Sequence, residues 1–239
     1  MAEDRGAFTA ATGRQLEAAG RDKPRYRRYQ YDLIAPHCGR TILEVGAGLG
    51  EFAEQFDDVD RLVLTDVDPG AVELMARRFA GRPEVQTRTL ALGVAPGLEE
   101  PVDSVVAINV LEHIEDDAGA LRSLATAVQP GGSIVLWVPG YQQLYGEFDR
   151  KVGHVRRYTP STLASAVRRA GLDVELVKPV NLLGGIAWWL TVRRGGSTSP
   201  DSKLVAVFDR FVVPVTRALE RVVRPPFGQS VLCVARVRA

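Results

Sequence analysis

The chain has 239 residues, 46% of them hydrophobic and 25% charged, which is typical of a soluble globular protein with one domain and an appendage. The formal net charge of +1 argues against a global attraction to nucleic acid or to anionic membranes. The two cysteines, Cys38 and Cys233, lack the spacing of a metal site or a disulfide framework, so we expect buried thiols in a reducing, cytoplasmic compartment.

The N-terminal part of the chain, residues 1–39, is expected to form a helical cap. Its first residues, MAEDRGAFTA, lack the basic-then-apolar pattern of a signal peptide. The segment Arg25–His37 alternates aromatic, basic and apolar residues, which favours a helix that docks on a core and stops at Pro36. We expect His37 to be structural.

From Arg40 onward, strand-like and helix-like segments alternate. The expected strands are Thr41–Val45, Arg61–Asp68, Val85–Leu92, Asp103–Val110, Ser133–Pro139, Asp173–Val180 and Ser230–Arg238. The expected helices begin near Glu51 and cover Pro69–Phe79, Ala118–Val128 and Pro160–Leu172, with Asp68 and Thr159 as N-caps. The first five strands are nearly continuous apolar runs, as in strands covered on both faces. This alternation predicts a doubly wound α/β sheet with right-handed crossovers and a ligand crevice beyond the carboxyl ends of its strands.

Three glycines follow the first strand, in the stretch TILEVGAGLGEF. Gly46, Gly48 and Gly50 suit a turn that needs positive φ and lets a ligand approach the backbone. A tight turn without any ligand is the alternative that this stretch leaves open. The spacing G-x-G-x-G differs from the G-x-G-x-x-G of dinucleotide binders, which argues against a nicotinamide cofactor.

Two acidic residues narrow the choice of ligand. Asp66 lies at the end of the second strand, twenty positions after Gly46, where an acid can accept hydrogen bonds from both ribose hydroxyls. Glu44 precedes the first glycine by two positions and would repel a pyrophosphate. A ligand with a cationic end fits better, and S-adenosylmethionine has an amino group, a sulfonium and a ribose with both hydroxyls free.

Four stretches, ILEVGAGLG, LTDVD, DSVVAINVLEHIED and QPGGSIVLWVP, resemble the successive motifs of class I S-adenosylmethionine-dependent methyltransferases, in the right order along the chain. The later stretch LYGEFDRKVGHVRRYTPSTL resembles a bacterial small-molecule subgroup near the ubiquinone-biosynthesis type. The resemblance implies a Rossmann-like fold with a seven-stranded, mostly parallel sheet and an antiparallel last strand. We expect a cap at 1–39, a cofactor-binding α/β domain at 40–180 and 229–239, and a helical insert at 181–228.

The resemblance also implies a site for S-adenosylmethionine, with S-adenosylhomocysteine as the product. Glu44, Gly46 and Gly48 would line the methionine end of the cofactor, and Asp66 would bind its ribose. Asn109 would contact the amino-acid end through its carbonyl. The other cofactor contacts expected along these motifs are Ala47, Gly50 and Val110.

The adenine end of the expected site departs from the family pattern. Val67 would pack on the adenine face. Many family members place an acid after the third strand to meet the adenine amino group, but the stretch TLALG has none. Adenine is therefore expected to be read by backbone atoms near Leu90–Leu92.

Methyl transfer is an in-line displacement at the sulfonium carbon, so the protein chiefly positions the acceptor and excludes water. A hydroxyl acceptor would also need a general base. The candidate catalytic residues are His154 in the loop DRKVGHVRRYT, His113 after the fourth strand, and Tyr158. We place His154 ahead of His113 for substrate contact, because a histidine at the latter position could simply bond to the local backbone. No metal site is expected.

Charged residues surround both histidines. The loop around His154 concentrates basic, acidic and aromatic side chains: Arg150, Lys151, Arg156, Arg157, Glu147, Asp149, Tyr141, Tyr145, Phe148 and Tyr158. Such a loop would suit an anionic or aromatic acceptor, and a salt-bridged structural loop is the alternative. The acids near His113 are expected to form a solvated helix start that complements the helix dipole: Glu112, Glu115, Asp116 and Asp117.

The segment between the sixth and seventh expected strands is apolar and helical. Asn181–Arg194 is rich in Trp and Leu, and a flexible stretch, Gly195–Ser202, follows it. A helical stripe comes next, formed by Leu204, Phe208, Phe211, Val215, Leu219 and Val222. Pro214 is expected to kink this helix. Three interpretations remain open: core packed on the sheet, a lid or dimer face over an apolar substrate, or a basic amphipathic contact with a membrane.

The leading functional hypothesis is methyl transfer to a small molecule with an apolar or anionic part. Nucleic-acid methylation is less favoured, because the fourth strand ends in NVLEH rather than Asn/Asp-Pro-Pro-aromatic and no Pro-Cys nucleophile is present. The alternative is a cofactor-binding protein that does not methylate: a cyclase, a lyase or a structural partner on the same fold. A homodimer is a further expectation.

Overall fold

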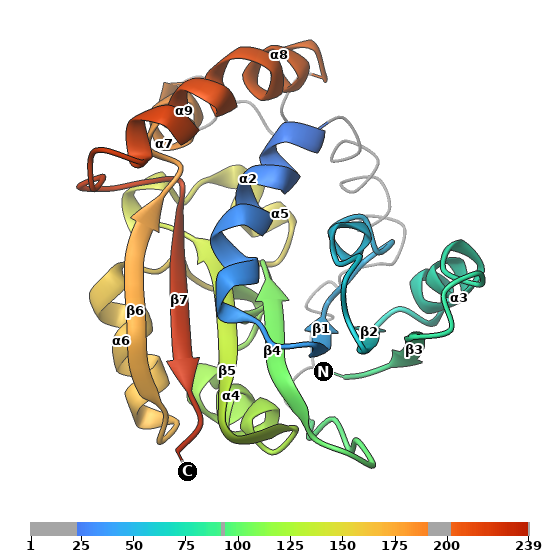
Figure 1. The fold of residues 1–239 in the computed structure, drawn as a ribbon. Helices are drawn as coiled ribbons and strands as arrows, with labels where there is room; N and C mark the ends of the chain where they lie inside the picture. Colours follow the sequence, from blue (N-terminus) through green and yellow to red (C-terminus); the bar gives the residue numbers. More distant parts are fainter. Residues whose placement is uncertain (1–22, 92–93, 191–201, 239) are drawn as a thin grey trace, which may run out of the picture.

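Seven strands form one sheet in the computed structural model, which describes residues 23–91, 94–190 and 202–238 (Figure 1). The strands are β1 (Thr41–Val45), β2 (Arg61–Asp66), β3 (Val85–Thr89), β4 (Val102–Ile108), β5 (Val128–Pro139), β6 (Asp173–Val180) and β7 (Ser230–Arg236). Their order across the sheet is β3-β2-β1-β4-β5-β7-β6. The order reverses between β1 and β4, and open α/β sheets bind ligands beyond the carboxyl ends of the strands at such a point.

Strand direction confirms the predicted fold class. β1 to β5 pair in parallel, and β7 runs antiparallel to both of its neighbours, β5 and β6. The apolar runs explain why these segments form central strands: Val105 and Val106 of β4, which face opposite sides of the sheet, are both fully buried.

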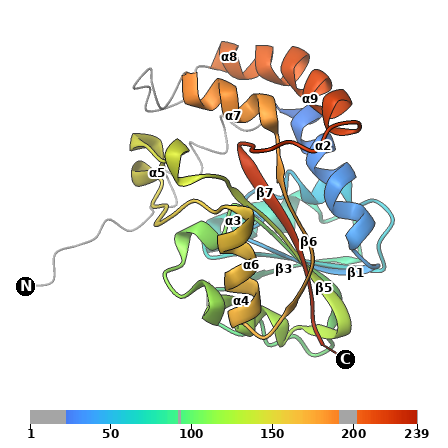
Figure 2. The same ribbon diagram turned by 90° about the vertical axis from the view of Figure 1, so that its left-hand side faces the viewer.

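Helices cover both faces of the sheet (Figure 2). The two clusters of buried apolar side chains place α2 (Pro24–Ile34) and α3 (Pro69–Arg78) on one face, and α4 (Asp117–Ala125) and α6 (Pro160–Arg169) on the other. Short 3-10 turns are Ala35–His37, Ala53–Gln55, Leu111–His113 and Gln142–Leu144. Both predicted N-caps are confirmed, since the Asp68 carboxylate accepts from the Gly70 N–H at 2.9 Å and the Thr159 hydroxyl from the Thr162 N–H at 3.2 Å.

α2 docks on the core through aromatic rings, as its sequence predicts. Trp137 of β5 is fully buried, and the rings of Tyr26 and Tyr29 meet it edge-on at centroid distances of 6.3 and 5.9 Å. Residues 1–22 of the expected cap lie outside the described residues.

Two local expectations are wrong. The helix expected near Glu51 is only the 3-10 turn Ala53–Gln55, because Phe52 and Phe56 both turn into the core and pack on each other at 5.5 Å. Strand β5 begins at Val128, five residues before its expected start. There Gly131, at φ +77°, donates its N–H to the Val237 carbonyl at 3.0 Å, so the Pro-Gly-Gly stretch belongs to the strand.

The segment between β6 and β7 forms helices that lie over the carboxyl ends of the parallel strands (Figures 1 and 2). These are α7 (Leu182–Trp188), α8 (Ser202–Val207), a π-helical turn (Phe208–Val212) and α9 (Val213–Glu220). The π turn stands directly before Pro214, which cannot donate a helical hydrogen bond. Across the described ranges, no helix has both the length and the apolarity that crossing a bilayer requires. Most of the expected flexible stretch 195–202 lies outside those ranges.

Candidate functional site

The glycine-rich turn adopts the backbone that its sequence predicts. Gly46, Gly48 and Gly50 have φ values of +68°, +60° and +75°, a region that side chains with a Cβ rarely occupy. Space is also restricted: a Cβ on Gly46 would lie 2.6 Å from Cγ2 of Val110. The Ala47 N–H bonds to the Thr65 carbonyl at 2.8 Å, which fixes the turn at the end of β2.

Asp66 holds this turn from the neighbouring strand. Its Oδ2 accepts the Gly48 N–H at 2.9 Å and its Oδ1 accepts the Asp68 N–H at 3.0 Å. A carboxylate offers about four acceptor positions, so each oxygen can still accept a hydrogen bond from a hydroxyl group. The acid is therefore fixed in place and keeps the acceptor capacity that a ribose needs.

Glu44 is buried on the same face of the sheet as Asp66. Glu44 pairs in register with Leu64, which lies two residues before Asp66, and side chains two apart on a strand share a face. Among the described residues, its Oε2 has no hydrogen-bond partner. Burial raises the pKa of Glu44 to about 8. A buried carboxyl group without a partner suits a cationic ligand, so the donor set fits the amino group of S-adenosylmethionine.

An apolar recess opens on the other side of β1, at the strand ends. Its lining comes from β1, β4, β5, the segment after β3 and the region around α4: Val45, Leu90, Ala91, Val94, Ala107, Val110, Leu111, Ile114, Ala120, Leu124 and Leu136. Leu90 and Val110, both expected from the sequence, are among them. Val67 is half exposed on the turn after β2. The recess and Val67 both offer apolar surface at this edge of the sheet. Leu92, also expected to take part, lies outside the described residues.

Asn109 follows β4 in a left-handed conformation, with φ +54°. Its N–H bonds to the Trp137 carbonyl at 2.8 Å, so the backbone is held in this uncommon state by β5. A left-handed residue at a strand end is a frequent mark of functional sites. Its exposed position at the switch point fits the predicted contact with the cofactor.

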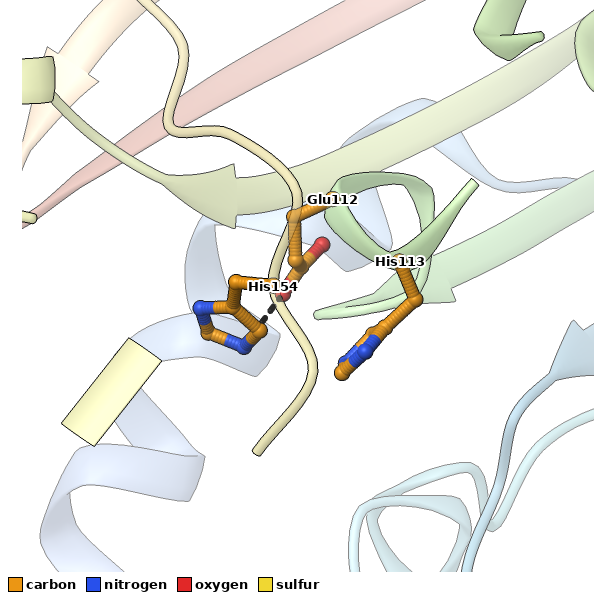
Figure 3. A group of neighbouring side chains, drawn as sticks. All are labelled: Glu112, His113 and His154. Atoms are coloured by element: carbon orange, nitrogen blue, oxygen red, sulfur yellow. Dashed lines mark ion pairs between the residues drawn. The ribbon is translucent and has the colours of Figure 1, made fainter. Parts of the chain in front are cut away.

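Three side chains meet at the end of β4: Glu112, His113 and His154 (Figure 3). The two imidazole rings lie edge to face with centroids 4.7 Å apart. His154 Nε2 lies 3.7 Å from Oε1 of Glu112. One ligand atom from each residue lies within 4.8 Å of the others, which makes this the group with metal-ligand spacing in the described part of the chain.

The burial of Glu112 corrects the expectation of a solvated helix start. Its side chain is 0% exposed, and neither carboxylate oxygen has a hydrogen-bond partner among the described residues. Burial raises the pKa of Glu112 to about 8. Asp117 is also buried, in ion pairs with Arg156 at 2.9 Å and Arg169 at 2.8 Å. Only Glu115 and Asp116 are exposed as expected.

His154 is oriented by an ionised acid that our sequence analysis treated only as a loop charge. Its Nδ1 lies 2.8 Å from Oδ1 of Asp149, and Arg157 donates to both oxygens of the same carboxylate at 2.8 and 3.1 Å. Burial opposes the charge, but the hydrogen bonds from His154 and Arg157 outweigh it and lower the pKa of Asp149. A carboxylate at Nδ1 assigns the proton to that nitrogen, which leaves the Nε2 lone pair facing Glu112.

His113 is a neutral imidazole. Burial first, and then the neighbouring His154, lower the pKa of His113 to about 4. The loop that carries His154 also passes close to the His113 ring. A Cβ atom placed on Gly153 of this loop would lie 3.8 Å from His113 Nδ1.

Tyr158 does not reach the crevice. It is buried, and its hydroxyl lies 3.2 Å from the Asp117 carboxylate and 3.4 Å from the Leu111 carbonyl. Burial raises the pKa of Tyr158, so the phenol stays neutral. The expected catalytic role is replaced by a structural one, in which Tyr158 links α4 to the loop after β5.

The loop after β5 is ordered around Asp149 as α5 (Glu147–Lys151). Trp188 of α7 packs on it: the ring lies 5.1 Å from that of Phe148 and 5.2 Å from the Arg157 guanidinium, and its Nε1 donates to the Leu144 carbonyl at 3.2 Å. Arg157 and Trp188 were missed as site residues. The signal in the sequence was a pair of opposite charges, Asp149 and Arg157, that lie on either side of His154.

Residues 9–177 match the family model described as "Methyltransferase domain". A protein of Mycolicibacterium smegmatis named "Probable S-adenosylmethionine-dependent methyltransferase" is 31% identical over 178 residues, which cover 72% of this chain and 68% of that one. A "Ubiquinone biosynthesis O-methyltransferase" of Paracidovorax citrulli is 29% identical over 161 residues, 60% of this chain and 67% of that one.

A solved structure shares the fold. The N-methyltransferase NodS of Bradyrhizobium japonicum, in complex with S-adenosyl-L-homocysteine, aligns with a TM-score of 0.57 and 16% identity, over 92% of this chain and 90% of that one. At this level of identity the likeness concerns the fold alone.

Proposed function

Because the chain belongs to the methyltransferase family and is an S-adenosylmethionine-dependent enzyme, we propose that it methylates a hydroxyl group of a small molecule with an apolar part, with His154 as the general base. The bound cofactor supplies an electrophilic methyl group on a sulfonium. The observation that carries the proposal is the fixed imidazole: Asp149 holds Nδ1 at 2.8 Å, so Nε2 is the nitrogen free to take a proton. The name O-methyltransferase of the Paracidovorax relative supports an oxygen acceptor.

The donor site is assigned to the residues around the glycine turn. Glu44 binds the amino group, Asp66 accepts from the ribose hydroxyls, and Asn109 contacts the amino-acid end. The backbone of the turn and the apolar recess complete the site through Gly46, Ala47, Gly48, Gly50, Val67, Leu90 and Val110. The unpartnered Oε2 of Glu44 and the fixed carboxylate of Asp66 support this assignment.

The cofactor, when bound, would supply the methyl group to the acceptor oxygen, and His154 Nε2 would take the proton that the hydroxyl loses. The imidazolium then lies against the ionised Asp149 carboxylate, which stabilises its positive charge. Neutral His113 lies beside this nitrogen and orients the acceptor by a hydrogen bond.

The test uses S-adenosylhomocysteine formation with matched acceptors: an alkyl phenol, the corresponding aniline and the corresponding thiophenol. We expect turnover of the phenol. His154→Ala should lower its kcat by about 10²–10⁴-fold, while calorimetry with S-adenosylhomocysteine gives an unchanged Kd. His37→Gln, a histidine remote from the site, is the matched control and should leave both values unchanged.

Two outcomes would contradict the proposal. Loss of S-adenosylhomocysteine binding in His154→Ala would mean that this loop belongs to the cofactor site, and full turnover would remove His154 as the base. We expect chelators to leave turnover unchanged. Activity lost with a chelator and restored by a divalent cation would instead assign Glu112, His113 and His154 to a metal ion.

For partners and location, the proposal is a cytoplasmic enzyme with a small-molecule substrate. Two free cysteines support a reducing compartment: Cys233 is buried and Cys38 half-buried, and burial raises the pKa of each thiol to about 12. A membrane contact and a homodimer contact of the insert at 181–228 would require different kinds of exposed surface.

A further inference from the structure

The helices α8 and α9, with the π turn between them, have a buried inner face. Val205, Val213 and Thr216 are at most 7% exposed. Asp209 is buried as well, and its carboxylate accepts the N–H groups of Arg25 and Tyr26 at the start of α2, at 3.2 and 2.9 Å. This face is the part of the segment that packs as core.

The opposite face is apolar and exposed. Leu204, Val207, Phe211 and Val215 are spaced three, four and four residues apart, which places them on one side of the helices, and Val222 follows in the turn after α9. Their exposed fractions are 55, 51, 60, 57 and 82%. The stripe predicted from the sequence therefore splits: Phe208 and Leu219 turn partly inward, and the rest face outward. At the end of the adjacent α7, Trp189 and Leu190 are also exposed.

Every exposed charge on this segment is positive. Lys203, Arg210, Arg221 and Arg224 are exposed. Residues 203–227 contain only two acids, and both face the protein: Asp209 is buried, and Glu220 binds the Tyr29 hydroxyl at 2.5 Å and the Leu182 N–H at 2.8 Å. The net charge of +1 for the whole chain hides this local excess.

We propose that this face, the apolar stripe of Leu204, Val207, Phe211, Val215 and Val222 with its four flanking cations, docks the enzyme on the surface of a bilayer that contains anionic lipid. An interfacial helix places its apolar side chains among the acyl chains and its cations at the phosphate level. A second copy of the chain is a poorer partner, because a two-fold contact would bring two identical cationic faces together.

The docking face lies next to the proposed catalytic site. α7, which contacts α9, carries Trp188, whose ring touches Arg157, and Arg157 in turn binds the Asp149 carboxylate that holds His154. These helices cover the carboxyl ends of the strands in both views (Figures 1 and 2). The inference deepens the proposed function, on which this part rests: the acceptor is an amphiphile whose apolar tail resides in the bilayer.

Sedimentation of the full chain with vesicles tests the docking face. We expect binding to phosphatidylcholine vesicles in which about a third of the lipid is phosphatidylglycerol, weak binding to phosphatidylcholine alone, and release by high salt. Phe211→Ser with Val215→Ser, and separately Arg210→Glu with Arg221→Glu, should each lower the partition coefficient by about tenfold or more. The matched controls are Leu74→Ser on α3 and Arg88→Glu on β3, both exposed and distant, which should bind as the unaltered protein does.

Failure to bind anionic vesicles, or equal binding by all four variants, would overturn the proposal. A dimer in solution that Phe211→Ser with Val215→Ser dissolves, without vesicle binding, would assign the face to a second copy. Calorimetry with S-adenosylhomocysteine and thermal unfolding confirm that each variant is folded. The vesicle result does not depend on the acceptor, so it is distinguishable from a failure of the phenol assay.

Discussion

Glu44 and Glu112 are buried carboxyl groups. Among the described residues, Glu44 Oε2 and both carboxylate oxygens of Glu112 have no hydrogen-bond partner. Burial raises the pKa of each to about 8, so both are largely protonated at neutral pH. Such groups cost stability unless they serve a ligand or a reaction. Each raised pKa therefore gives a pH-dependent signature that can be measured.

Glu44→Gln tests the cationic contact. Binding a cation favours the ionised form of Glu44, so at pH 7 the unaltered protein should release a proton, about one per S-adenosylhomocysteine bound, and affinity should rise as pH approaches 8. Calorimetry in buffers of different ionisation heat measures this release, which Glu44→Gln should abolish. Glu54→Gln, an exposed acid nearby, is the control. Equal proton release in Glu44→Gln would contradict the contact.

Glu112→Gln tests the burial of the second acid through stability. The folded-state pKa of about 8 lies above the ordinary glutamate value of 4.5, so the folded protein keeps a proton that the unfolded chain has lost. The free energy of unfolding should therefore fall as pH rises from 4.5 to 8, on the order of 4 kcal/mol for this group. Above about pH 6.5, where His113 is neutral in both the folded and the unfolded chain, Glu44 contributes a similar fall. Glu112→Gln should therefore remove about half of the slope between pH 6.5 and 8 in urea titrations. Exposed Glu115→Gln should leave the slope unchanged.

At the scale of elements, the glycine turn and β2 act as one unit. The Gly48 N–H and the Asp66 carboxylate are bonded at 2.9 Å, so a change in either residue should disturb both the turn and the proposed ribose contact. The sequence was sufficient here, because positive φ and a strand-end acid are local properties of the chain. β1 and β6 were likewise predicted residue for residue.

Asp66→Ala and Gly48→Val should each weaken S-adenosylhomocysteine binding at least tenfold, ~1.4 kcal/mol. The first removes the ribose acceptor, and the second places a β-branched residue at φ +60°. Gly81→Val is the matched control, since a Cβ there meets nothing within 4 Å. Unchanged titration curves in the folded variants would remove both residues from the cofactor site.

At the scale of the whole molecule, local pattern was insufficient wherever distant segments meet. Glu112 reads as a solvated acid beside its polar neighbours, but the loop with His154, about forty residues later, covers it. Tyr158 reads as a loop aromatic, and only the approach of α4 shows that its hydroxyl is used by Asp117. The two faces of the insert follow from its contact with α2, which no periodicity in its own sequence reveals.

The insertion of β7 between β5 and β6 has a consequence for how this protein can diversify. Val180, where the chain leaves the sheet, is the register partner of Ser230, where it returns. The intervening helices are thus an excursion from two adjoining strand ends, and they can be lengthened, shortened or exchanged without shifting any strand. The sheet and the glycine turn can therefore stay constant while selection reshapes these helices, which we propose to lie beside the acceptor site.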